Sequence, residues 1–175
     1  MNGLAYAGIG SRRTPPDYLA LMTEWARAWA AEGVTLRSGH APGADQAFER
    51  GAGENAEIFL PWAGFESDVP IVARRVVYVP SVDAYRIAER MHPYWRFLKP
   101  SVQALHARNV HQVLGADCDS PALCVLCWTP RGSGRGGTGQ AIRTARAYGV
   151  PVFDLGKLGA PVLAAATALL LESRG

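Results

Sequence analysis

The sequence predicts an α/β fold, a single Rossmann-like domain of three layers with a mainly parallel sheet. Short apolar runs punctuated by glycine alternate with stretches of helical spacing along the 175 residues, a pattern typical of strands joined by helices. Hydrophobic residues make up 49% of the chain and charged residues 19%, enough to build a core of domain size. We therefore expect residues 1–175 to form one domain, with an elaborated insertion at about residues 63–115.

The predicted elements follow one another in order along the chain. Five apolar runs are the predicted strands, at residues 3–9, 34–38, 57–60, 122–128 and 150–155. Helices are predicted after the N-cap candidate Thr14 up to about Gly33, then at residues 44–51, 139–148 and about 160–172. Thr14 is followed by two prolines and an acid, a combination typical of a helix start.

The regular pattern loosens between residues 62 and 115. Four prolines interrupt any long helix here, namely Pro70, Pro80, Pro93 and Pro100. A connection of this length inside a compact domain is more often functional or partly disordered than neutral. Aromatic residues cluster at residues 94–97, and we favour a core position in a short helix for Trp95 and Phe97.

Charge and hydropathy narrow the class of protein. Lys and Arg total 18 against 15 Asp and Glu, so the net charge of +3 does not by itself indicate a nucleic-acid partner. The longest nearly apolar run, residues 160–171, is shorter than the roughly 18 to 20 residues that span a bilayer. The first residues lack the pattern of a secretory signal. We therefore expect a cytoplasmic protein with no membrane contact.

The three cysteines do not form a metal motif. Cys124 and Cys127 lie three residues apart in a predicted strand, where such side chains point to opposite faces. We expect no metal and no resident cofactor.

Three glycine-rich loops each follow a predicted strand, at residues 8–13, 38–45 and 129–139. In a parallel sheet, all three lie at the carboxyl edge, where open α/β sheets bind ligands. Each loop also opens a helix, whose first turn presents free backbone N–H groups, and glycine lets an anion approach them. Five arginines add positive charge in or near the loops: Arg12, Arg13, Arg37, Arg131 and Arg135. The loops therefore predict a phosphate site, although glycines that only permit tight turns give the same pattern.

The predicted phosphate-binding and nucleotide-binding residues come from all three loops. They are Gly10, Ser11, Arg12, Ser38, Gly39, Gly43, Ala44, Asp45, Thr129, Gly136, Gly137, Thr138 and Gly139.

Several of these side chains have two interpretations. Asp45 either caps its helix or contacts a ribose hydroxyl or acts in catalysis. His40 is a candidate acid, base or phosphate donor, or a turn residue without chemistry. Trp62 and Trp128 follow strands at the same edge and either stack on a base or pack in the core. A dinucleotide fingerprint, Gly134-x-Gly136-x-x-Gly139 with Asp154 as the ribose acid, lies too near the end of the chain to be convincing.

The loops resemble a known group of proteins. Residues 7–12, 36–48, 136–141 and 150–153 look like the motifs of the SLOG superfamily, whose members include DprA (Smf) and the LOG nucleotide phosphoribohydrolases. The DprA-like segment Ser-Gly-x-Ala-x-Gly-x-Asp matches residues 38–45 in every fixed position. The resemblance implies a Rossmann-like fold, commonly dimeric, with a nucleotide or nucleic-acid phosphate site in the crevice.

The resemblance to the phosphoribohydrolases is incomplete. Their loop is followed by a catalytic glutamate, whereas Ile142 and Arg143 stand where acids are expected here. Hydrolysis of a base–sugar bond, a nucleotide N-glycosidic hydrolase activity, therefore requires Asp45 or Glu49 as a replacement acid. We leave open whether the protein is an enzyme.

The leading hypothesis is a protein that binds a nucleotide or nucleotide-derived small molecule through its phosphate and sugar. The alternatives are a DprA-like protein that binds single-stranded DNA, which needs a continuous basic track and stacking aromatics, and the hydrolase. The apolar helix at residues 161–171 carries Leu163, Leu169, Leu170 and Leu171 and has little polar surface. It predicts a homodimer.

Overall fold

The computed structural model describes residues 3–174 of the chain. Six parallel strands form one sheet in the order β4-β3-β2-β1-β5-β6. Their bounds are β1 (Ala5–Gly10), β2 (Thr35–Ser38), β3 (Ala56–Phe59), β4 (Arg75–Val77), β5 (Val125–Trp128) and β6 (Val152–Asp154). The chain winds from β1 out to β4 and then returns to the other side of β1. The switch between β1 and β5 is where ligands bind in open α/β sheets.

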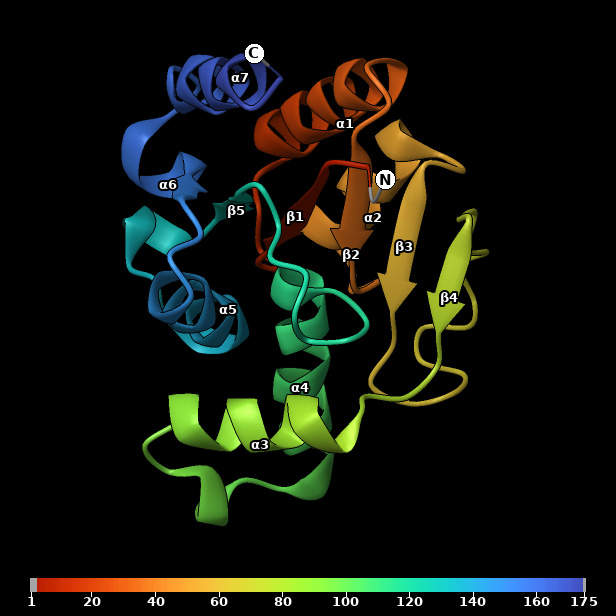
Figure 1. Cartoon of the computed structure of the whole chain (residues 1–175), viewed down its shortest axis with the longest axis vertical. Helices are drawn as coiled ribbons and strands as arrows, with labels where there is room; N and C mark the ends of the chain where they lie inside the picture. Colours follow the sequence, from red (N-terminus) through yellow and green to blue (C-terminus); the bar gives the residue numbers. More distant parts are fainter. Residues whose placement is uncertain (1–2, 175) are drawn as a thin grey trace.

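Helices cover both faces of the sheet, which makes three layers and confirms the Rossmann-like α/β fold (Figure 1). One face carries α1 (Pro16–Ala31), α2 (Ala44–Ala52), α6 (Leu155–Leu158) and α7 (Val162–Glu172). The other face carries α3 (Val82–Met91), α4 (Pro100–Leu114) and α5 (Gly136–Ala147).

Strand alternation divides the core between these two faces. In β1, Tyr6 packs edge to face on Trp25 and Trp29 of α1, with ring centroids 5.2 Å and 5.0 Å away. Ala7 belongs to the cluster under α4 and α5. Cys124 and Cys127 are buried in the two different clusters, which confirms that they point to opposite faces.

The insertion contains more regular structure than its sequence pattern indicates. Residues 63–115 hold β4, α3, α4 and a 3-10 turn, η1 (Trp95–Phe97). Three of the four prolines lie at the ends of helices rather than inside them, so they separate α3 from α4 and leave both helices intact. Pro80 precedes the N-cap Ser81 of α3, Pro93 follows α3, and Pro100 opens α4, a position that needs no backbone N–H. β4 was missed because it is a three-residue edge strand, half-buried at most.

Three local expectations were also wrong. Phe97 is 87% exposed and is not a core residue, whereas the half-buried Trp95 packs against the core. Thr14 does not cap α1, because its hydroxyl donates to the Ser11 carbonyl at 2.7 Å and the N-cap position is Pro15. Finally, α5 begins at Gly136 rather than Gly139.

The helices of the described part of the chain lack the combination of length and apolar character needed to cross a membrane.

Candidate functional site

A hollow of about 450 Å³ lies at the carboxyl ends of β1 and β5, at the switch point of the sheet. The first and third glycine-rich loops both line it, and the second loop contributes Ala41 and Asp45. The remaining side of the hollow is formed by α4, through Leu105, Arg108, Asn109 and Gln112. We call this the first hollow.

The first loop presents its backbone and two exposed arginines to the first hollow. The Gly10 N–H donates to Asp45 Oδ1 at 3.2 Å, and the Ser11 hydroxyl oxygen accepts from the Arg13 N–H at 3.0 Å. The Arg12 guanidinium makes an ion pair with Glu66 at 3.1 Å. Arg12 therefore lines the first hollow while its guanidinium is paired with a carboxylate.

Gly43 brings the second loop against the first. Its φ of +91° favours glycine, and a Cβ added there would lie 2.8 Å from the Ser11 carbonyl oxygen and 2.9 Å from Arg12 Cα. The sequence pattern predicts Gly43 as a phosphate ligand, but its position supports the loop that carries Ser11 and Arg12.

Three other predicted ligands of the second loop also lie behind the hollow rather than lining it. The Ser38 hydroxyl donates to a carbonyl of β1 at 2.8 Å. Gly39 leaves room for the Arg108 guanidinium, which fills the space of an added Cβ. Ala44 packs closely against Gly10. These residues shape the site through packing.

His40 is bound on all sides and does not line the first hollow. Its side chain is 1% exposed, its Nδ1 lies 2.6 Å from Glu49 Oε2, and its Nε2 lies 3.0 Å from the Val69 carbonyl oxygen. Its backbone N–H donates to Glu49 Oε1 at 2.8 Å. The bond to Glu49 raises the His40 pKa above its usual 6.5 and so favours the protonated ring. These bonds hold the ring in place inside the protein.

Asp45 and Arg108 form a buried ion pair at the back of the first hollow, with Nη1 and Oδ2 3.2 Å apart. Burial raises the pKa of Asp45 to about 6, although Arg108 opposes the shift. Burial also lowers the pKa of Arg108. Both groups are therefore moved toward their neutral forms, as expected where desolvation exceeds Coulomb attraction. The Asp45 side chain ties the first loop to α4. It does not cap α2, because Gly43 holds the N-cap position and no side chain caps that helix.

The α4 wall carries polar atoms that have no partner within residues 3–174: Arg108 Nε and both amide atoms of Gln112. Its third polar residue, Asn109, donates to the Gly137 carbonyl at 3.0 Å. Unpaired buried polar groups are costly, and a bound ligand or water is one explanation for them. Sequence reasoning missed this wall, although Arg108, Asn109 and Gln112 recur at helical spacing on an otherwise buried helix.

The third loop is held by Thr129 and Asp154. The Thr129 N–H donates to Asp154 Oδ1 at 3.0 Å, its hydroxyl donates to Oδ2, and its oxygen accepts from the Gly134 N–H at 3.1 Å. Asp154 also accepts from the Gly156 N–H. These bonds occupy Asp154, which argues against a ribose contact there. Neither Thr129 nor Gly139 lines the first hollow, and Gly139 packs against the Gly134 carbonyl.

The first turn of α5 faces the first hollow with Gly136, Gly137 and Thr138. No side chain caps this helix, so its first N–H groups point outward with the positive end of the helix dipole. A Cβ added to Gly137 meets no atom within 4 Å. This is open space beside free donors, the geometry that binds anions.

A second hollow of about 590 Å³ adjoins the first, and Leu105, Arg135, Gly136 and Gly137 line both. Its other walls include His92, Tyr94, His106 and Arg143. We call the two hollows together the groove. Exposed arginines lie along its length, namely Arg12, Arg13, Arg135 and Arg143.

Aromatic rings stand at one end of the groove. Tyr94 is 67% exposed, and the His92 and His106 rings lie 5.0 Å apart. Burial, His92 and nearby arginines lower the pKa of His106 to about 4, so its ring is neutral at neutral pH. The two tryptophans considered from sequence lie elsewhere: Trp62 packs on Phe65, and Trp128 lies near Tyr18.

No protein-family model matches this chain, and no curated protein matches it. Among solved structures, the fold is similar to that of DNA processing protein A from Helicobacter pylori, a protein described by its single-stranded DNA binding mode. The two share 20% sequence identity with a TM-score of 0.57, over 86% of this chain and 64% of that chain. The chain therefore spans less than two thirds of that neighbour, and the likeness shows a DprA-like fold.

Proposed function

We propose that this protein binds single-stranded DNA along the groove. The observation that carries the proposal is that the two hollows join into one arginine-lined track with an exposed aromatic at its end. Binding of single strands needs this combination of a basic path for the backbone and rings on which bases stack. The similarity in fold to a neighbour that binds single-stranded DNA supports the same function.

In this proposal, different residues of the groove bind the backbone phosphates and the bases of the strand. The first turn of α5 and Arg135 hold a backbone phosphate where the two hollows meet, because helix N–H groups and a guanidinium are both anion donors. Arg12 and Arg143 hold phosphates on either side. Tyr94 and the apolar side chain of Leu105 face the bases. In this proposal residues 63–115, through α4 and Tyr94, supply one wall of the groove.

A single nucleotide in the first hollow is the second candidate, and one observation favours it. The Asp45 carboxyl, with its pKa near 6, lines a hollow of about 450 Å³, a size in the range of small-molecule sites. We also propose that the chain belongs to the SLOG superfamily, on the motif of residues 38–45, and either candidate is compatible with that. A nucleoside monophosphate would then place its phosphate at α5, with its sugar toward Asp45.

Fluorescence anisotropy with a labelled 20-nucleotide oligothymidylate tests the proposal. We expect binding to weaken with salt, with a slope of log affinity of about −0.7 for each phosphate neutralised on a single strand. Arg135→Ala should lower affinity by about tenfold to a hundredfold and reduce the slope by about 0.7. Arg27→Ala removes an exposed arginine of α1, outside the groove, and is the matched control.

Two results would contradict the proposal. Equal losses in Arg135→Ala and Arg27→Ala would mean that only net charge attracts the strand. Binding of nucleoside monophosphates as tight as that of the oligonucleotide would favour the second candidate. Release of free base, lost in Asp45→Asn, would make that candidate a hydrolase.

The homodimer is a further part of the proposal. On α7, Leu170 is buried and Leu163 and Leu169 pack partly against the core, while Leu171 is 64% exposed. One side of α7 therefore packs on its own domain, and we assign the exposed side to contact with a second copy of the chain. Light scattering at micromolar concentration should give the mass of two chains, and the mass of one chain would refute it.

A further inference from the structure

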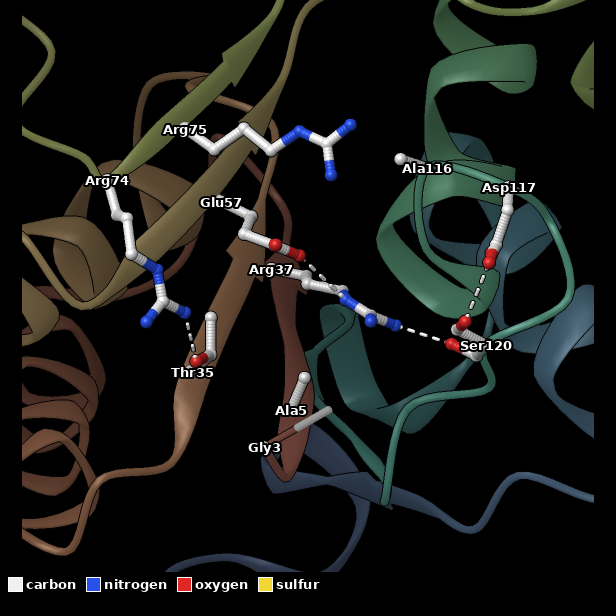
Figure 2. A pocket seen from close by; sticks show the side chains of 10 residues that line it. All are labelled: Gly3, Ala5, Thr35, Arg37, Glu57, Arg74, Arg75, Ala116, Asp117 and Ser120. Atoms are coloured by element: carbon white, nitrogen blue, oxygen red, sulfur yellow. Dashed lines mark hydrogen bonds and ion pairs between the residues drawn. The ribbon is translucent and has the colours of Figure 1, made fainter. Parts of the chain in front are cut away.

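A separate pocket of about 440 Å³ lies at the amino ends of the strands, at the sheet edge opposite the groove. Gly3 and Ala5 at β1, Thr35 at β2 and Arg75 at β4 mark these ends. The loop after α4 closes the far side (Figure 2). We call this the amino-edge pocket, and none of its lining residues lines the groove.

A row of charges crosses three strands in this pocket. Arg75, Glu57 and Arg37 are register partners on β4, β3 and β2, so their side chains share one face of the sheet. Arg37 Nε donates to Glu57 Oε2 at 3.1 Å, and its Nη1 donates to the Ser120 carbonyl at 2.6 Å. Glu57 is therefore taken by Arg37 and does not neutralise Arg75.

The other carboxylate of the pocket is also engaged. Asp117 accepts from the Asp119 N–H at 3.0 Å and from the Ser120 hydroxyl at 2.9 Å. These bonds lower the pKa of Asp117, so it is ionised and held within its own loop. It forms no ion pair with an arginine of the pocket in the described part of the chain.

Two guanidinium groups are left without an acidic partner. Arg74 Nη2 donates to Thr35 Oγ1 at 2.7 Å, which leaves its charge unneutralised. Arg75 makes no hydrogen bond or ion pair with residues 3–174 of this chain. Its guanidinium extends over the pocket in Figure 2. Both groups line the same pocket, and their unneutralised charge favours a bound anion there.

We propose that the amino-edge pocket binds the phosphate group of a small ligand, independently of the groove. Arginine forks match the geometry of phosphate oxygens. A tetrahedral phosphate offers enough acceptor oxygens for Arg74, Arg75 and the Thr35 hydroxyl together, whereas a carboxylate offers two. The volume of the pocket suits a small molecule rather than a polymer.

NMR titration of ¹⁵N-labelled protein tests this proposal, at fixed pH and ionic strength with chloride as the reference anion. Inorganic phosphate and glycerol phosphate are the two probes. We expect amide shifts at Thr35, Arg75 and Asp117 that saturate with either probe. Tighter binding of glycerol phosphate would identify the ligand as a phosphate ester, and equal binding would identify phosphate itself as the recognised group.

Variants decide whether the arginines are responsible. Arg75→Gln and Arg74→Gln should each weaken binding by about tenfold to a hundredfold, the usual effect of losing a charge-assisted contact. Arg86→Gln, which removes an exposed arginine of α3 paired with Asp83, should leave the affinity unchanged. Arg74 and Arg75 are both exposed, so the spectra of these variants should show an intact fold.

Shifts confined to residues 10–13 and 135–138 would overturn the proposal, because phosphate would then bind only in the groove. Unchanged affinity in both Arg75→Gln and Arg74→Gln would overturn it as well. Loss of oligonucleotide binding in Arg135→Ala has no bearing on this pocket, so the two proposals succeed or fail separately.

Discussion

The ion pair between Arg12 and Glu66 sets up a competition with DNA. The two side chains are 3.1 Å apart, with 58% of Arg12 and 31% of Glu66 exposed. A phosphate that binds Arg12 must replace Glu66, so Glu66→Gln should strengthen binding of an oligonucleotide. Surface pairs of this exposure contribute about 0.2–1 kcal/mol. The corresponding gain in affinity is about 1.4-fold to about fivefold.

A double-mutant cycle measures this competition directly. Anisotropy titrations of the labelled oligothymidylate are made with wild type, Glu66→Gln, Arg12→Ala and the double variant. The gain from Glu66→Gln should shrink in the Arg12→Ala background, because the competing partner has been removed. The backbone of Glu66 has a φ of +51°. Glutamine has a Cβ as glutamate does, so the backbone strain at this position is the same in wild type and in Glu66→Gln.

Removing any acid near the groove also raises affinity through long-range attraction. Asp68→Asn is the matched control, since it removes one negative charge two residues along the same exposed segment. Its effect should be the same with and without Arg12. If Glu66→Gln gives an equal gain in both backgrounds, Arg12 does not contact the strand and the assignment is refuted.

Three further predictions concern the loops that shape the groove. Glu49→Gln should destabilise the fold more at pH 6 than at pH 9, as measured by urea melts. The His40 pKa is raised in the folded protein, so the pair with Glu49 stabilises the fold fully below pH 6.5. That contribution is lost as the pH rises through the folded-state pKa of His40. Gly43→Ala should lower the free energy of unfolding by at least about 1–3 kcal/mol, from strain at positive φ plus the clash with Ser11. Gly137→Val should leave the melting temperature nearly unchanged yet weaken oligonucleotide binding by about tenfold or more, because its side chain fills the space beside the α5 donors.

Each of these predictions has its own control. A cost of Glu49→Gln that does not vary with pH would show that His40 is neutral in the folded protein. Gly53→Ala has a similar positive φ with no atom within 4 Å of the added Cβ, so it separates strain from the clash at Gly43. Unimpaired binding by a well-folded Gly137→Val would remove the first turn of α5 from the site.

Local patterns were sufficient for the central strands and the three loops. The apolar runs near β1, β2 and β5 are long enough to be recognised, and a parallel sheet places the loops after them at one edge. Residues 10–13 and 136–138 line one hollow, and their role in binding stays a prediction. β4 escaped recognition because an edge strand of three residues has no sustained apolar pattern.

The sequence by itself determined where glycine-rich loops follow strands, because the preference of residues for turns and the spacing of apolar residues are local properties of the chain. Only the tertiary structure decided which side chains meet. Asp45 and Arg108 are 63 residues apart and form a buried pair, while His40 is turned away from the groove by Glu49 and Val69. Such partners depend on how α4 packs across the sheet, and the free energy of that packing comes from contacts between distant segments that no local pattern records.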